Sequence, residues 1–234
     1  MWSAVARDLS GTVLVTGGSS GLGAAVVRAV ADAGATPVVL DVRPPAPGVA
    51  YEAVDLADSK EAEEAVHRAA RTHGGLRAVV TCAGIDVPGA LVDVPAETWE
   101  RIVAVNLLGT VAVVRAALPW LDESRGSVVT VASTLGHRVF ADATAYCASK
   151  FAVVGFTRAL QAEVKGRIAV TLLSPGGMST AFFDGREERY RPGPDARLND
   201  PAAVAAAVVF VLSQPAGSEV KELVVTGSDE SSWP

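Results

Sequence analysis

Short β-branched runs alternate with longer alanine-rich stretches along the whole chain. The apolar runs are continuous, which is typical of strands buried on both faces of a parallel sheet. Predicted strands cover residues 12–16, 36–41, 50–55, 76–82, 127–133, 168–174 and 222–227. Predicted helices cover residues 21–34, 59–73, 96–120, 145–165 and 201–213. This alternation predicts an α/β fold with one doubly wound parallel sheet of about seven strands and helices on both faces.

One polar stretch interrupts the alternation. Residues 183–200, FDGREERYRPGPDARLND, are rich in Pro and Gly and lie between the sixth predicted strand and the last predicted helix. Ordered loops of this length are uncommon unless they are functional. Ligands of doubly wound folds bind beyond the carboxyl ends of the strands. We therefore predict that residues 181–200 form a lid over a substrate.

Composition narrows the class of protein. The chain has 234 residues, of which 50% are hydrophobic, enough for one sizeable domain and short for two. The net charge of -6, without a Lys/Arg cluster, argues against nucleic-acid binding. Cys82 and Cys147 match no CxxC or zinc spacing and are expected to be free thiols. The three histidines also lack ligand spacing, so we predict no metal site.

We expect a cytoplasmic protein that does not span a membrane. The start of the chain, MWSAVARDLSGTVLV, lacks the basic segment, apolar core and cleavage site of a signal peptide. Residues 102–121 approach the length of a span, but Asn106, Gly109, Arg115 and Pro119 interrupt them. Because a charge inside a span is costly, we interpret this segment as a core helix.

A glycine-rich loop, TGGSSGLG, follows the first predicted strand and leads into the first predicted helix. Gly17, Gly21 and Gly23 allow a tight turn and let a diphosphate approach the free N–H groups of the helix. An ordinary glycine-rich turn is the alternative. Here the loop opens a βαβ unit, which is the context that dinucleotide binding requires. The loop therefore predicts a Rossmann-type nucleotide-binding domain.

The GxxxGxG order resembles the short-chain dehydrogenase/reductase family, whose loop reads TGxxxGxG. The family pattern also has an Asn in the fourth helix, a Ser after the fifth strand and Tyr-x-x-x-Lys on the next helix. Asn106, Ser133, Tyr146 and Lys150 match these positions in order, and SPGGMST with Thr180 matches the turn after the sixth strand. The resemblance covers nearly the whole chain and implies a nicotinamide-dependent oxidoreductase.

The end of the second predicted strand bears on the choice of cofactor. Asp41 stands where an acidic side chain binds the adenosine ribose hydroxyls and repels a 2′-phosphate, although a turn aspartate can occupy the same place. Arg43 is able to pair with such a phosphate. Ser19 and Ser20, however, are neutral where NADP-preferring relatives often carry a basic residue. We expect NAD(H), with NADP(H) disfavoured.

The resemblance extends the expected cofactor contacts to other motifs. Asp55 is expected to contact the adenine, and it is followed by Leu56. The full set is Gly17, Ser19, Ser20, Gly21, Leu22, Gly23, Asp41, Asp55, Leu56, Cys82, Ala83, Gly84, Tyr146, Lys150, Pro175, Gly176, Met178 and Thr180. One motif departs from the family, because TCAG at residues 81–84 replaces Asn-Asn-Ala-Gly. The two lost amides put cofactor affinity or sheet rigidity in doubt.

Tyr146 and Lys150 lie four residues apart and share one helix face. Alone, the pair is equally consistent with a phenol and a lysine stem lying on a helix surface. A phenol has a pKa of about 10, and a cation one turn away is expected to lower it toward neutral pH. With a cofactor loop present, we predict that Tyr146 is the acid/base and that Ser133 hydrogen-bonds to the substrate oxygen.

The resemblance gives two supporting roles. Lys150 is implied to hold the nicotinamide ribose, and Asn106 to anchor a water that links Lys150 to solvent. Taken singly, Ser133 is also explained as a strand end and Asn106 as a helix bend. Two alternatives to an NAD(H)-dependent oxidoreductase remain open: an NADPH-dependent ketoreductase and a nicotinamide-binding regulator without turnover. The complete set of four residues argues against the regulator.

The substrate is expected to be a small secondary alcohol or ketone, and its class stays undefined. Substrate-facing candidates are the loop TLGHRVFAD, the turn near Gly177 and Met178, and the lid. Apolar side chains in these segments suggest an apolar pocket or local packing; they are Val139, Phe140, Phe182 and Phe183. Next to them, His137 and Arg138 suit an acidic group or face water.

Surplus apolar surface predicts self-association. The helices near 102–118 and 146–160 carry Val, Leu, Ala and Phe beyond what one sheet covers. The resemblance implies pairing through these helices as a homodimer or homotetramer. Trp233 near the end of the chain is expected to dock on the body of the protein or on a neighbouring subunit.

Overall fold

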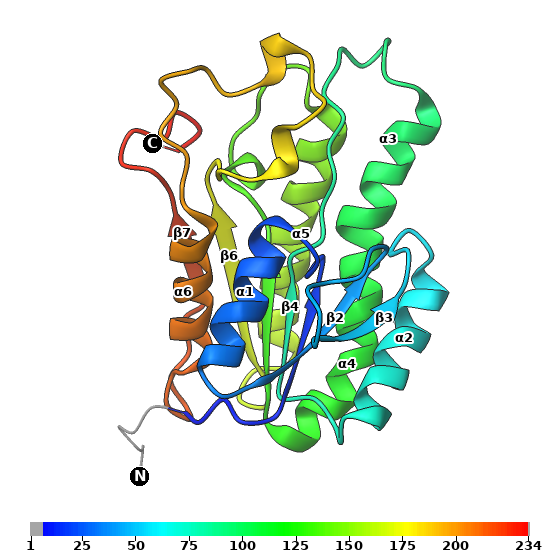
Figure 1. Ribbon diagram of the computed structural model, residues 1–234, viewed down its shortest axis with the longest axis vertical. Coiled ribbons are helices and arrows are strands. Elements are labelled where there is room, and N and C mark those ends of the chain that lie inside the picture. Colours follow the sequence, from blue (N-terminus) through cyan, green and yellow to red (C-terminus); the bar gives the residue numbers. More distant parts are fainter. Residues whose placement is uncertain (1–6, 234) are drawn as a thin grey trace.

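Seven parallel strands form one sheet in the computed structural model, which describes residues 7–233 (Figure 1). The strands are β1 (Thr12–Thr16), β2 (Thr36–Asp41), β3 (Ala50–Ala53), β4 (Ala78–Thr81), β5 (Ser127–Val131), β6 (Ala169–Pro175) and β7 (Glu222–Val225). Their order is β3-β2-β1-β4-β5-β6-β7. The order reverses between β1 and β4, which is where ligands bind in such sheets. The predicted doubly wound parallel sheet is confirmed.

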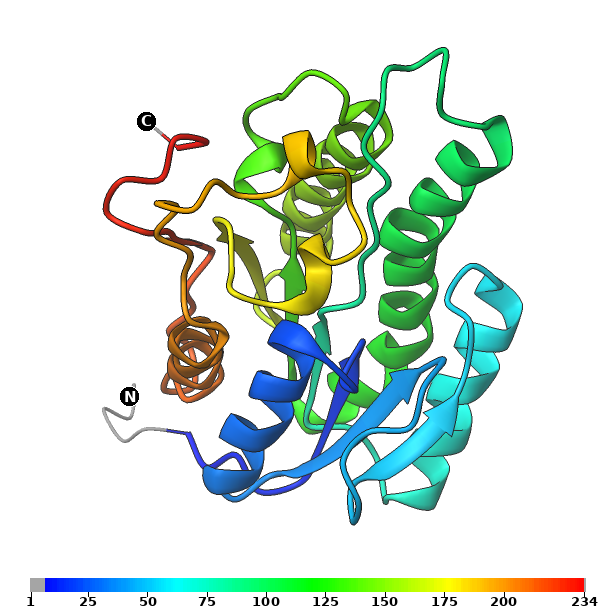
Figure 2. The same cartoon turned by 45° about the horizontal axis from the view of Figure 1, so that its top comes forward.

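Helices cover both faces of this sheet. They are α1 (Gly21–Asp32), α2 (Ser59–Thr72), α3 (Ala96–Val103), α4 (Thr110–Ser124), α5 (Thr144–Glu163) and α6 (Pro201–Leu212). Helices α1 and α6 pack against each other on one face, and α2, α4 and α5 lie on the other (Figures 1 and 2). The sheet is therefore the middle of three layers.

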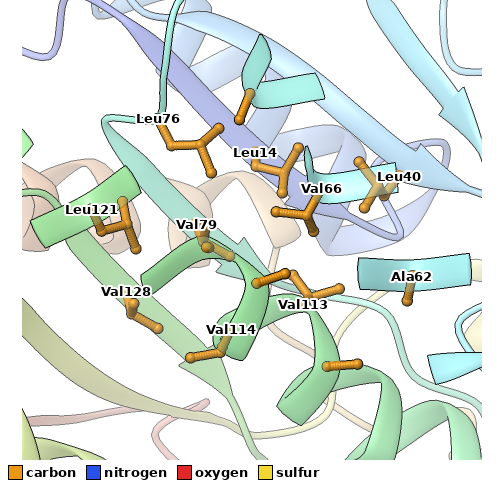
Figure 3. Close-up of a cluster of buried hydrophobic side chains, with 14 of the residues drawn as sticks. Leu14, Leu40, Ala62, Val66, Leu76, Val79, Val113, Val114, Leu121 and Val128 are labelled. Atoms are coloured by element: carbon orange, nitrogen blue, oxygen red, sulfur yellow. The ribbon is translucent and has the colours of Figure 1, made fainter. Parts of the chain in front are cut away.

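Each strand contributes to two cores, because successive residues of a strand point to opposite faces. Val13 and Val15 of β1 join the core under α1 and α6, whereas Leu14 between them joins the core under α2 and α4. Figure 3 shows the second core, with Leu14 near Val66 of α2 and Val113 of α4. This burial on both faces explains why the strands are continuous apolar runs.

The prediction of a single helix at 96–120 is wrong in one respect. A π-helical turn, Ala104–Gly109, separates α3 from α4. Its extra residue turns the side chain of Asn106 into the interior, where it is fully buried. The Thr110 hydroxyl donates to the Asn106 carbonyl oxygen at 2.9 Å. At Gly109 an added Cβ would lie 2.6 Å from the carbonyl oxygen of Leu56, so only glycine fits. Such turns are frequent at functional sites.

The same stretch was considered above as a possible membrane-spanning segment. Among the described residues, the continuous helix 96–124 is the one long and apolar enough to cross a membrane, and 56% of its most apolar window is buried inside the molecule. That burial is what a core helix shows. Residues 1–6, part of the segment considered as a signal peptide, lie outside the described residues.

Residues 181–200, the predicted lid, cross the end of the molecule to which the strands point (Figure 2). The segment contains two short 3₁₀ turns, Ala181–Phe183 and Glu188–Tyr190. The Tyr190 hydroxyl donates to Asp142 Oδ2 at 2.9 Å, and Asn199 Nδ2 donates to the Val225 carbonyl oxygen at 3.1 Å. The segment is thus held at its middle and near its C-terminal end, and its role as a lid stays a prediction.

The C-terminal tail docks on the body of the protein, as predicted for Trp233. The indole of Trp233 packs edge-on against the imidazole of His137, with ring centroids 5.3 Å apart. Ser232 is buried, and its hydroxyl shares a hydrogen bond of 2.7 Å with Thr134. Glu230 Oε2 accepts from the Gly177 N–H at 2.9 Å. The tail therefore contacts two loops at the carboxyl edge of the sheet.

Candidate active site

The glycine loop lies close against the end of β4. Gly17 has a φ of 67°, and an added Cβ would lie 2.8 Å from the Cα of Ala83. At Gly23 an added Cβ would lie 2.2 Å from the carbonyl oxygen of Gly17. No side chain fits at either place. The loop backbone therefore forms an open cradle at the point where the strand order reverses.

The N-terminus of α1 suits a phosphate. Its cap residue, Ser20, makes no side-chain capping hydrogen bond, and the first turn, which holds Gly21 and Leu22, has no acidic residue. The first N–H groups and the positive end of the helix dipole are therefore available to an anion. Thr180 lies over this turn, 3.6 Å from where a Cβ of Gly21 would be. These residues fit a dinucleotide diphosphate.

Asp41 ends β2 beside the loop, and its carboxylate is mostly buried. Oδ2 accepts from the Ser19 N–H at 3.1 Å, and Oδ1 accepts from the Arg43 N–H at 3.0 Å. The Arg43 guanidinium in turn donates to Ser20 Oγ at 3.3 Å. Each carboxylate oxygen retains acceptor capacity. A carboxylate that suits ribose hydroxyls and a guanidinium that suits a phosphate thus flank the same loop.

Asp55 and Leu56 follow β3. Asp55 Oδ1 accepts from the Ala57 N–H at 3.0 Å, and Oδ2 lies 2.8 Å from a guanidinium nitrogen of Arg101. Burial pushes the pKa of Asp55 up, but these donors outweigh it and the pKa lies below its ordinary value. The Leu56 side chain is buried in the core under α2 and α4. The adenine contact expected of Asp55 stays a prediction.

The TCAG segment shows what replaces the two family amides. The Ala83 N–H donates to Thr16 Oγ1 at 3.1 Å, which ties the segment to β1. The Thr81 hydroxyl oxygen is buried and has no hydrogen-bond partner within residues 7–233. Burial raises the pKa of the Cys82 thiol to about 12, although Lys150 opposes this, so the thiol is neutral. The segment is thus closely packed against the glycine loop, and one of its buried hydroxyls lacks a hydrogen bond within residues 7–233.

Asn106 acts as a clamp on the chain just beyond TCAG. Its Oδ1 accepts from the Ile85 N–H at 2.8 Å, and its Nδ2 donates to the Ile85 carbonyl oxygen at 2.9 Å. Nδ2 also donates to Ser149 Oγ at 3.1 Å. The amide of Asn106 therefore joins the π-helical turn, the loop after β4 and α5. The water expected at Asn106 stays a prediction.

Lys150 of α5 lies close to Asn106 and is 4% exposed. Its Nζ donates to the Val131 carbonyl oxygen at 2.9 Å and would lie 3.5 Å from a Cβ placed on Gly84. Burial lowers the pKa of Lys150 to about 8. Lys150 is thus a fixed ammonium that reaches the end of β4 from α5.

Tyr146 lies one turn before Lys150 on α5, with Nζ 5.7 Å from the phenol ring centre. Burial raises the pKa of Tyr146 to about 12, although the Ser133 hydroxyl opposes this. The predicted lowering is therefore wrong for the protein by itself. Burial is the largest cause, and Lys150, whose ammonium donates to the Val131 carbonyl, is not among the groups that shift this pKa. Ser133 Oγ accepts from the Leu135 N–H at 3.1 Å, at the start of the 3₁₀ turn Thr134–Gly136.

The turn after β6 completes the expected cofactor side. Pro175 ends β6, and at Gly176 an added Cβ would lie 2.4 Å from Glu230 Oε2 of the tail. Met178 packs on the core under α1 and α6 and pairs through its backbone with Asn199. Thr180 Oγ1 accepts from the Phe182 N–H at 3.3 Å. The glycine turn after β6 is thus packed against Glu230 of the tail.

The sequence-predicted aromatic residues separate into two groups. Phe182 packs 5.7 Å from Tyr146 and 5.5 Å from Phe183, ring centre to ring centre. Val139 and Phe140 instead line a separate hollow of about 390 Å³, formed by Arg138–Phe140 and the tail residues Ser231–Trp233. Val139 and Phe140 therefore lie next to the tail, whereas Phe182 and Phe183 lie next to Tyr146.

Sequence reasoning missed two charged residues beside these phenylalanines. Asp86 follows the clamped Ile85, and Arg186 comes from the lid. Arg186 Nη2 lies 3.1 Å from Asp86 Oδ2, with side chains 11% and 7% exposed. No motif in the sequence marks either residue. Asp86 is a single acid two residues after TCAG, and Arg186 is one of several arginines in the lid. Among residues 7–233, no group of three or more His, Cys, Asp or Glu side chains is placed to hold a metal ion.

Together, the fold, the open glycine loop and the Ser133–Tyr146–Lys150 group define an oxidoreductase of the Rossmann class. The sequence profile described as short chain dehydrogenase matches residues 11–191, and the chain belongs to this family. The resemblance in the motifs is thereby confirmed.

Relatives match over most of their length. An L-fucose dehydrogenase of Mus musculus is 33% identical over 97% of this chain and 91% of its own, and one of Bos taurus is 32% identical over 93% and 88%. An uncharacterized oxidoreductase of Staphylococcus aureus is 32% identical over 91% and 95%.

Solved structures share the fold. An alcohol dehydrogenase of Thermococcus sibiricus complexed with 5-hydroxy-NADP has a TM-score of 0.82 at 23% identity, over 92% of this chain and 96% of its own. A ligand-free aldohexose dehydrogenase of Thermoplasma acidophilum has a TM-score of 0.82 at 24% identity, over 93% and 92%. At these identities the likeness supports the fold alone.

Proposed function

We propose that the protein transfers a hydride between NAD(H) and a secondary alcohol or ketone, with Tyr146 as proton donor and acceptor. The observation that carries the proposal is the group formed at the carboxyl edge of the sheet. There the phenol of Tyr146 lies beside the Ser133 hydroxyl and 5.7 Å from the ammonium of Lys150, next to an open glycine cradle.

The proton chemistry follows from the surroundings of Tyr146. With a pKa of about 12, the phenol is protonated at neutral pH and is ready to donate to a carbonyl oxygen during reduction. Ser133 hydrogen-bonds to the same oxygen and stabilises the charge that develops there. When bound, the nicotinamide supplies or accepts the hydride. In the oxidation direction, Tyr146 removes the alcohol proton.

Lys150 and Asn106 support Tyr146 in different ways. With a pKa of about 8, Lys150 is mostly an ammonium at neutral pH, and it is positioned to bind ribose hydroxyls beside Gly84. Its charge also favours the phenolate when the proton leaves. Asn106 holds the Ile85 backbone with two hydrogen bonds and fixes the wall of the site. We assign Asn106 a positioning role.

The NAD(H) assignment rests on Asp41 outweighing Arg43. Asp41 Oδ2 already holds the Ser19 N–H, and its charge lies where a 2′-phosphate would be repelled. The bond from Arg43 to Ser20 is the one observation in favour of an NADPH-dependent ketoreductase. A fluorescence titration with NADH and, separately, NADPH decides between them. Tighter binding of NADPH would overturn the assignment.

The L-fucose dehydrogenase relatives, at 32–33% identity, support a sugar hydroxyl as the first substrate to test. The assay mixes purified protein, NAD⁺ and L-fucose and follows NADH absorbance. We expect NADH formation that depends on both components. Cofactor binding without turnover on L-fucose or on a panel of secondary alcohols would contradict the enzyme and favour the regulator.

Self-association is proposed on the outer faces of two helices. Leu108 of the π-helical turn is 48% exposed and Phe151 of α5 is 43% exposed. Side chains of this size are unfavourable in water and suit a subunit interface. Light scattering on the purified protein is expected to give the mass of a dimer or tetramer, whereas a monomer mass would contradict the interface.

A further inference from the structure

Asp86 and Arg186 form an ion pair whose hydrogen bonding is incomplete. Their side chains are 7% and 11% exposed, and Oδ2 and Nη2 lie 3.1 Å apart. Within residues 7–233, however, Asp86 Oδ1 and Arg186 Nε are buried without a hydrogen-bond partner, and the contact of Nη2 with Asp86 is an ion pair without hydrogen-bond geometry. Buried polar groups in proteins nearly always have partners, and an ion pair of this kind is costly without them. Two such atoms, one on each side chain of the pair, indicate a group that a ligand completes.

The pair lies next to the proposed acid/base. The Arg186 guanidinium carbon lies 4.6 Å from the centre of the Phe182 ring and 4.9 Å from that of Phe183. Phe182 in turn packs against Tyr146. Burial dominates the raised pKa of Tyr146, but the charges of Asp86 and Arg186 also act on the phenol. The unpartnered atoms and the reacting hydroxyl therefore belong to one cluster.

The chemistry of the pair defines what would complete it. The pair is neutral as a whole, so a carboxylate substrate would meet Asp86 and an ammonium would meet Arg186. A hydroxyl both donates and accepts hydrogen bonds. One hydroxyl is able to donate to Asp86 Oδ1 while its neighbour accepts from Arg186. A simple alcohol or ketone would leave these atoms unpaired, which is the basis of strong discrimination between substrates.

We propose that Asp86 and Arg186 form a subsite for hydroxyl groups next to the reacting carbon, which makes neutral vicinal polyols such as cyclic sugars the substrate class. This inference rests on the proposed function, because it places the reacting carbon at Tyr146. Asp86 and Arg186 are specificity-determining residues that contact substrate and take no part in the proton transfer.

The test compares two alcohols that differ by one hydroxyl. They are cyclohexanol and the cis-cyclohexanediol whose two hydroxyls are vicinal. The main variant combines Asp86→Leu with Arg186→Met, because replacing both charges by apolar side chains avoids an isolated buried charge. Asp86→Asn is the milder second variant. Tyr190→Phe is the control, since it removes the lid hydrogen bond to Asp142 and leaves the pair intact. Thermal melts confirm that each variant folds.

The expected readout is the ratio of kcat/KM for the diol to that for cyclohexanol. In the double variant this ratio falls by about tenfold to a hundredfold, mainly through KM, because charged hydrogen bonds to substrate are lost. In Tyr190→Phe the ratio is unchanged. Equal losses on both alcohols in the double variant, or a wild-type ratio near one, would overturn the subsite and leave the pair as a lid latch.

A binding measurement separates this inference from the proposed function. Calorimetry of the NADH-saturated protein with the diol requires no turnover. If the wild type turns over neither alcohol but binds the diol more tightly than the double variant, the proposed function fails and the subsite stands. If the wild type oxidises alcohols but binds the diol no better than the double variant, the subsite fails and the proposed function stands.

Discussion

The two sides of the carboxyl edge of the sheet are built differently. On the side of β1 and β2, backbones approach so closely that Gly17 has no room for a methyl group against Ala83, and Asp41 binds N–H groups through both oxygens. On the side of the lid, Asp86 and Arg186 are buried together with unpartnered atoms. On one side the backbone is closely packed and the carboxylate is satisfied, whereas the other side is polar and incomplete.

We interpret this difference by what each side is proposed to bind. A dinucleotide always presents the same diphosphate, so a fixed backbone cradle is sufficient. A substrate is selected when its groups complete polar atoms that a wrong substrate would leave unpaired. The cost of burying Asp86 and Arg186 without full hydrogen bonding is then recovered only with the correct substrate. Specificity is thus expected from the side whose buried polar atoms lack partners.

The largest effect is expected where the two sides meet, at Tyr146. Tyr146→Phe removes the proton donor and is expected to lower kcat by a factor of about 10² to 10⁴. The variant should still bind NADH, because the glycine loop is untouched. Steady-state kinetics and a fluorescence titration measure the two quantities. Tyr51→Phe in β3 is the matched control, and retained turnover in Tyr146→Phe would remove Tyr146 from its role.

The next effect tests the satisfied side. Asp41→Asn keeps an acceptor for the loop N–H groups but removes the charge. The ratio of NADPH to NADH affinity is expected to rise by roughly tenfold to a hundredfold. The variant loses both a charged hydrogen bond to the ribose of NADH and the repulsion of the 2′-phosphate of NADPH. Asp32→Asn, on the exposed end of α1, is the control. An unchanged ratio would mean that Asp41 is only a loop ligand.

A smaller effect tests the close packing. Gly17→Ala places a methyl group 2.8 Å from the Ala83 Cα at a φ of 67°, and it is expected to lower the free energy of unfolding by about 1–3 kcal/mol. Gly48→Ala also has a positive φ, of 88°, but no atom within 4 Å. Urea titration of both variants separates packing from backbone strain. Equal losses would show that the contact with Ala83 contributes nothing.

The smallest effect concerns the tail, which contacts the turn after β6 through Gly177 and the 3₁₀ turn after β5 through Thr134. Burial pushes the pKa of Glu230 up, but hydrogen bonds from Ser232 and Gly177 outweigh it and hold the pKa below its ordinary value of 4.5. The stabilisation is therefore present above pH 4.5 and is lost as the pH falls through the lower folded value.

We expect Trp233 fluorescence, taken as the difference between wild type and Trp233→Phe, to change in this acidic range. Glu230→Gln lacks the titrating group and should show no such transition. If the difference signal followed the same pH curve in Glu230→Gln, another group would control the docking of the tail.

The sequence predicted the satisfied side well and the incomplete side poorly, for physical reasons. Gly17, Gly21 and Gly23 lie within one loop, and their spacing reports a local backbone shape. Asp86 and Arg186 meet across a hundred positions, and their meeting depends on how the lid folds. The direction of the Tyr146 pKa was missed for a related reason, since a neighbour in sequence was visible and the extent of burial was not.

The π-helical turn at Ala104–Gly109 also sets the phase between α3 and α4. An α-helix advances about 100° per residue, so deleting one residue there would rotate everything before it by that angle relative to α4. Ile102, now fully buried, would turn toward solvent, and Asn106 would leave Ile85. We therefore expect a single-residue deletion in this helix to be more damaging than most substitutions. Length variation among relatives should spare this turn and gather in the loops around it.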